Sequence, residues 1–128
     1  MNDLSSGPGD SAWNHDPRMA QVIEQAMQKL ASRCLLVDVR PPAEFRAARI
    51  RGSVNIPVDE IEKHADRIRS LARGRDVGLV SQSGLKAGRA ASILERCSSL
   101  EIHVVDGGVD EWKNAGLPLV LSCTGTVH

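Results

Sequence analysis

A short polar stretch, Ser81 to Lys86, joins an apolar run to a segment with helical spacing. Val77 to Val80 has the pattern of a short buried strand, and small or apolar residues at 87, 90, 91 and 94 predict a helix. In a small polar turn of this kind, successive backbone N–H groups can point into one concavity beside the positive helix end. The sequence therefore predicts an anion-binding turn, with the Ser81 side chain at its floor.

Cationic side chains near this turn extend the candidate site. Lys86 is placed to face a bound anion, as a point charge without the bidentate fork of arginine. Arg40 ends an earlier apolar run and is predicted to contact the substrate at the mouth of the site, whereas we expect Asp38 to be structural. The candidate substrate-binding residues are Gln82, Ser83, Gly84, Leu85, Lys86 and Arg40.

Other chemistries fit the sequence poorly. The turn is not Gly-x-Ser-x-Gly, and no Asp and His follow in the order that a serine hydrolase needs. The Gly84-x-x-x-Gly88 spacing lacks the Gly-Lys-Ser/Thr ending of a nucleotide P-loop. The four histidines and three cysteines are scattered without metal-ligand spacing. We therefore predict no metal and no cofactor.

The composition limits the range of partners. A chain of 128 residues, 41% apolar and 25% charged, suits one domain with one core. With one Phe, two Trp and no Tyr, the core must be aliphatic, and base stacking on nucleic acid is disfavoured. Sixteen basic residues balance sixteen acidic ones, so no net field favours a polyanion. We expect no nucleic-acid partner.

The predicted compartment follows from the cysteines and the N-terminus. Three cysteines, without a basic and apolar leader, indicate reduced thiols and a cytoplasmic protein. No apolar run approaches the length that spans a membrane, so we expect no membrane segment in this chain.

The elements that position the turn alternate along the chain. Residues 1–15 are predicted to be a flexible leader, 16–120 a single domain, and 121–128 a tail. A helix over 16–32 starts at Asp16-Pro17, and its apolar stripe is expected to pack on the domain: Met19, Val22, Ile23, Ala26, Met27 and Leu30. Further helices are predicted over 59–72 and 109–114, and strands over 34–40 and 101–106, with a turn and then a short strand within 50–57. This order predicts an α/β fold with a mainly parallel sheet, whose ligands bind at the carboxyl ends of the strands.

Several segments together resemble a rhodanese domain, over about residues 33–120. They are Leu-Val-Asp-Val-Arg (36–40), Glu44-Phe45, Ile50-x-Gly52-Ser53-x-Asn55-Ile56-Pro57, the turn 81–86, and Asp106-Gly107-Gly108-x-x-x-Trp112-x-x-x-Gly116-x-Pro118. The resemblance implies a five-stranded, mainly parallel sheet with helices on both faces. It also implies transfer of sulfane sulfur from thiosulfate or a persulfide donor to a thiol or cyanide acceptor, through a persulfide at position 81.

This chain departs from the family pattern at three positions. The family normally has cysteine where Ser81 stands, usually arginine at Lys86, and often histidine at Arg49. A thiol ionises near pH 8.5 and lower in such a turn, whereas a serine hydroxyl is far less acidic and no base is evident beside it. Oxygen also forms no persulfide. The Ser81 form should therefore bind anions without transferring sulfur.

Two explanations of Ser81 stay open. It is either an engineered Cys-to-Ser replacement or the mark of a naturally non-catalytic module for anion or protein binding. The intact turn and the retained cysteines, Cys34, Cys97 and Cys123, favour the first. A phosphatase-like or arsenate-reductase-like relative is a weaker third reading, because related phosphatases have a turn one residue longer. The sequence leaves the oligomeric state open, and we expect a monomer.

Overall fold

The computed structural model describes residues 17–121, so the predicted leader, Trp13 and Cys123 lie outside the described residues. In chain order the elements are α1 (Pro17–Arg33), β1 (Cys34–Asp38), α2 (Pro42–Ala47), β2 (Ala48–Arg49), β3 (Val54–Asn55), η2 (Val58–Glu60), α3 (Ala65–Ala72), β4 (Asp76–Val80), α4 (Leu85–Cys97), β5 (Ile102–Val104), α5 (Gly108–Asn114) and β6 (Val120–Leu121). The predicted α/β class is confirmed.

The central sheet contains four parallel strands in the order β3-β1-β4-β5. Asp38, at the end of β1, lies opposite Val80, at the end of β4, so both strands finish at the same edge. The sequence predicted five strands in this sheet. Among residues 17–121 a fifth does not join it, because the remaining strands, β2 and β6, pair with each other in a separate antiparallel ribbon.

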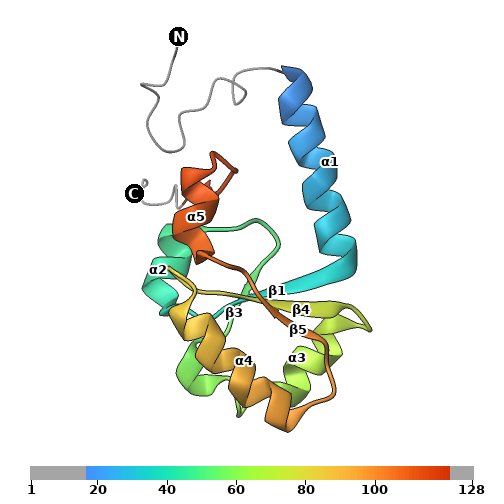
Figure 1. Ribbon diagram of the computed structural model, residues 1–128, viewed down its shortest axis with the longest axis vertical. Coiled ribbons are helices and arrows are strands. Elements are labelled where there is room, and N and C mark those ends of the chain that lie inside the picture. The colour runs from blue at the N-terminus through green and yellow to red at the C-terminus, as the bar shows by residue number, and fades with distance from the viewer. Residues whose placement is uncertain (1–16, 122–128) are drawn as a thin grey trace.

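Helices cover both faces of this sheet, as Figure 1 shows. On one face α3, α4 and η2 pack against Leu35, Val37 and Leu79. On the other, α1 and α5 pack against Leu36 and Val80. The two central strands are thus buried on both sides, which explains why their sequences are almost continuously apolar.

Two helix predictions need correction. The stripe of α1 packs only in part: Met27 is buried and Ile23 and Leu30 are partly buried against the same core, but Val22 is 54% exposed. α1 runs directly into β1, and its N-terminal end extends past the sheet (Figure 1). The helix predicted over 59–72 is broken into η2 and α3, although its inward residues Ile61 and Ile68 are buried as expected.

Candidate anion-binding site

The turn 81–86 lies where β4 ends and α4 begins. The Ser81 side chain is buried, with 1% of the residue exposed, and its Oγ accepts a hydrogen bond from the backbone N–H of Gly84 at 2.9 Å. Gly84 has a φ of 104°, which only glycine adopts without strain, and it precedes the first residue of α4. The hydroxyl oxygen of Ser81 therefore lies inside the turn.

The back of the turn is fixed to the N-terminus of α5. The carbonyl oxygens of Ser81 and Gln82 accept hydrogen bonds from the N–H groups of Val109 and Asp110, each at 2.9 Å. The approach is close: a Cβ on Gly108 would lie 2.1 Å from the Ser81 carbonyl oxygen, and Gly108 itself has a φ of 58°. Only glycine allows α5 to sit this near the turn.

These bonds also determine where the turn's N–H groups point. A trans peptide is planar, with its C=O and N–H on opposite sides. Since the carbonyls of Ser81 and Gln82 face α5, the N–H groups of Gln82 and Ser83 face away from it. Within residues 17–121 these two N–H groups, and those of Leu85 and Lys86, donate to no protein acceptor. The turn therefore presents a set of open donors, next to a helix N-terminus, that suits a small anion.

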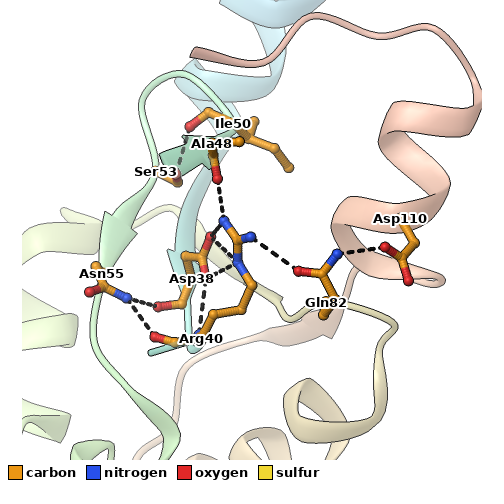
Figure 2. A network of polar contacts seen from close by, with 8 residues as sticks. All are labelled: Asp38, Arg40, Ala48, Ile50, Ser53, Asn55, Gln82 and Asp110. Carbon is orange, nitrogen blue, oxygen red and sulfur yellow. Dashed lines mark hydrogen bonds and ion pairs between the residues drawn. The ribbon is translucent and has the colours of Figure 1, made fainter. Parts of the chain in front are cut away.

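A buried ion pair stands behind the turn, at the end of β1 (Figure 2). Asp38 is fully buried and Arg40 is 3% exposed. The Arg40 Nε and Nη2 groups donate to the Asp38 carboxylate over 2.9–3.1 Å, and the Arg40 backbone N–H donates to Asp38 Oδ1 at 3.0 Å. Asn55 Nδ2 donates to the backbone carbonyls of both residues, which fixes the segment that carries the pair.

The guanidinium of Arg40 joins this pair to the turn. Nη2 also donates to the Ala48 carbonyl, and Nη1 donates to Gln82 Oε1 at 3.2 Å. Arginine has five N–H donors, and these contacts use four of them. The role of Arg40 as a substrate contact stays a prediction, which rests on the remaining Nη1 N–H.

The exposed residues of the turn are Gln82, Ser83, Leu85 and Lys86. Leu85 is 82% exposed, and Lys86 lies in the first turn of α4. Arg49, one of the three departures from the family pattern, has its guanidinium carbon 5.3 Å from the centre of the Phe45 ring.

Sequence reasoning missed the contacts that hold the turn from behind. The Gln82 amide donates through Nε2 to the Asp110 carboxylate, across 28 residues of chain. Asp110 follows the Asp106-Gly107-Gly108 segment of the rhodanese resemblance, which was the available signal that this region adjoins the turn. Nothing in the local sequence pointed to the partner of Gln82.

The cysteines within the described residues lie away from the turn. Cys34 starts β1, at the edge of the sheet opposite the site, and Cys97 ends α4. Burial raises the pKa of the Cys34 thiol above its usual value, and the nearby Asp76 carboxylate raises it further, while Arg75 opposes them. Neither thiol is placed to act at Ser81.

A groove of about 620 Å³ lies elsewhere, between α1 and the segment 113–121, and no residue of the turn lines it. In the part of the chain that the structure describes, no three His, Cys, Asp or Glu side chains gather as metal ligands would. Nor does any helix there have the length and apolar character needed to cross a membrane.

Comparison with known proteins agrees with this geometry. The family model described as a rhodanese-like domain matches residues 19–115. The chain belongs to the rhodanese-like domain family. Its relatives include the uncharacterized protein YqhL of Bacillus subtilis, 31% identical over 94 residues that cover 73% of this chain and 72% of that protein.

A protein named sulfurtransferase, from Allochromatium vinosum, is 30% identical over 99 residues, covering 76% of this chain and 90% of its own length. A rhodanese-related protein from Thermoplasma volcanium has a similar crystal structure, with a TM-score of 0.62, 27% identity, and coverage of 74% of this chain and 91% of that one. The chain spans only 42–60% of the length of several other curated relatives.

Proposed function

We propose that the turn 81–86 binds a small sulfur oxyanion and that residue 81 occupies the nucleophile position of a rhodanese-like sulfurtransferase. The observation that carries this proposal is the set of open N–H donors in the turn that begins at the buried Ser81. Membership of the rhodanese-like family and the similarity to a protein named sulfurtransferase support the reaction class.

With a cysteine at position 81, the reaction proceeds in two steps. The thiolate attacks the sulfane sulfur of thiosulfate, the sulfur–sulfur bond breaks, and sulfite leaves with the electron pair. A thiol or cyanide acceptor then takes the outer sulfur from the persulfide and restores the thiolate. The N–H donors of the turn stabilise the negative charge in both steps, because they are already oriented before the anion arrives.

The Ser81 form lacks the groups that this reaction needs. Its hydroxyl oxygen accepts from the Gly84 N–H, and within the described residues no side chain is hydrogen-bonded to it as a base. Oxygen at this position cannot carry sulfane sulfur as a persulfide. The proposal is therefore that this chain binds the anion and is silent in sulfur transfer, whether Ser81 is engineered or natural. We also propose that the protein is cytoplasmic and monomeric.

Thiocyanate formation from thiosulfate and cyanide tests the proposal. Ser81→Cys should gain activity by several orders of magnitude over the unchanged chain, since a catalytic nucleophile contributes on that scale. The matched control is Ser83→Cys, which puts a thiol on the exposed side of the same turn and should stay inactive. A folded Ser81→Cys protein without thiocyanate production, or equal activity in Ser83→Cys, would contradict the sulfurtransferase proposal.

The second candidate is a binding module, favoured by Ser81 itself. If Ser81→Cys binds thiosulfate without producing thiocyanate, the fold serves anion or protein recognition. The exposed Leu85 beside the turn then becomes the first residue to test for protein binding. Turnover of an aryl phosphate by Ser81→Cys would instead support the phosphatase-like reading.

A further inference from the structure

We propose that Gln82 is a positioning residue whose side chain links Arg40 to Asp110 and so holds the N–H donors of the turn in line with the anion. This inference rests on the anion-binding function proposed for the same turn. It assigns to the Gln82 side chain a role in orientation, in addition to the substrate contact that its backbone N–H offers.

The orientation of the Gln82 amide follows from its two partners. Arginine only donates hydrogen bonds and a carboxylate only accepts them. The Gln82 Oε1 must therefore face Arg40 and its Nε2 must face Asp110, as Figure 2 shows. Each end of the amide thus contacts a charged group, and charge-assisted hydrogen bonds of this kind are the stronger ones.

Gln82 is held to Asp110 at two points. Its backbone carbonyl accepts the Asp110 N–H at 2.9 Å, and its side-chain Nε2 donates to Asp110 Oδ1. The carbonyl belongs to the same planar peptide as the Ser83 N–H, so a rotation of that peptide would turn the Ser83 donor away from the anion. The side-chain link opposes this rotation because it ties Gln82 to α5 and to Arg40 together.

Arg40 supplies the fixed end of the link. It is buried and paired with Asp38, whose own carbonyl is bonded to Asn55. Gln82 and Asp110, by contrast, are exposed. We therefore expect the link to affect the direction of the turn's donors more than the stability of the fold.

The test uses the Ser81→Cys protein and measures the pKa of the new thiol. The rate of iodoacetamide alkylation is followed against pH on the peptide that contains residue 81, which separates it from the other cysteines. Adding Gln82→Met, which removes both amide contacts, should raise the apparent pKa of that thiol by about one pH unit, because its thiolate loses oriented donors. The distant control Gln25→Met should leave the pKa unchanged.

A rescue variant exchanges donor and acceptor. With Gln82→Glu and Asp110→Asn together, the new carboxylate accepts from Arg40 and from the asparagine amide, so the pKa should return towards that of the Ser81→Cys parent. A Gln82→Met protein with a lower melting temperature but an unchanged thiol pKa would overturn the inference, since that result indicates a structural role alone.

The two proposals fail separately. Absence of thiocyanate production by Ser81→Cys rejects sulfur transfer, yet the alkylation profile still reports whether Gln82 orients the turn. Normal sulfur transfer with the same thiol pKa in Gln82→Met rejects only the role assigned to Gln82.

Discussion

Two helices begin at the site, and their N-termini are used in opposite ways. Both α4 and α5 follow a glycine with a positive φ, 104° at Gly84 and 74° at Gly107, and neither has a side-chain cap. The N–H groups of Val109 and Asp110, the second and third residues of α5, donate to the carbonyls of Ser81 and Gln82. The first N–H groups of α4, by contrast, have no acceptor within residues 17–121.

This difference shows that a helix N-terminus does not by itself make an anion site. The N-terminus of α5 holds the backbone of the turn, and that contact leaves the N–H groups of the turn on the other side. The first N–H groups of α4, at the other end of the turn, stay without a protein acceptor within residues 17–121. The proposed anion site thus depends on two helix ends: that of α5, whose bonded N–H groups orient the turn, and that of α4, whose open N–H groups add to the donors. The predictions below disturb each in turn.

The largest effect is expected at Arg40, the buried residue that contacts the turn through Gln82. Arg40→Leu leaves the buried Asp38 carboxylate without its partner and should lower the free energy of unfolding by about 3–5 kcal/mol in urea titrations. The matched control is Arg51→Leu, which breaks the exposed pair with Glu24 (side chains 53% and 48% exposed) and should cost about 1 kcal/mol or less. Equal losses in the two variants would mean that Arg40 is not an anchor of the turn.

A substitution that adds one methyl group tests the contact between α5 and the turn. Gly108→Ala places a Cβ against the Ser81 and Gln82 carbonyls and should destabilise the protein by roughly 2–4 kcal/mol, because the chain must shift and φ is positive. Gly88→Ala, in the first turn of α4 where nothing lies within 4 Å of the new Cβ, should be neutral or stabilise by up to about 1 kcal/mol. Urea unfolding measures both changes. If the unfolding midpoint of Gly108→Ala equals that of the parent protein, α5 does not hold the turn as described.

The smallest effect is expected on thiosulfate affinity, from a residue at the open N-terminus of α4. Lys86→Ala removes an exposed cation from the first turn of α4 and should weaken thiosulfate binding roughly two- to five-fold, since one solvated charge contributes little. Isothermal titration at low salt measures this change. Arg89→Ala, one turn farther from the site, should have a smaller effect, and the reverse ranking would place the anion away from the start of α4.

The local parts of the site were predictable because their signals lie close together in the sequence. The change from strand to helical spacing around residues 81–86 placed the turn, and its small polar residues indicated free N–H donors. The link from Gln82 to Asp110 was not predictable, since its partners are 28 residues apart and meet only when α5 packs on the turn. Arg40 was predicted at the correct edge of the sheet, but its burial and its contact with Gln82 depend on tertiary packing.

The errors in the fold have the same origin. The apolar stripe of α1 is real, yet periodicity cannot tell how much of a helix lies against the body. The break between η2 and α3 escaped detection because Ile61 and Ile68 keep helical spacing across it, both facing the same core.

The most direct test is an NMR titration of the unchanged, isotope-labelled protein with thiosulfate, which follows each backbone N–H separately. We predict saturable shifts at the N–H groups of Gln82, Ser83, Leu85 and Lys86, with much smaller changes at Val109 and Asp110. Shifts confined to residues outside the turn, or no shift at these four groups at saturating thiosulfate, would contradict the anion-binding turn.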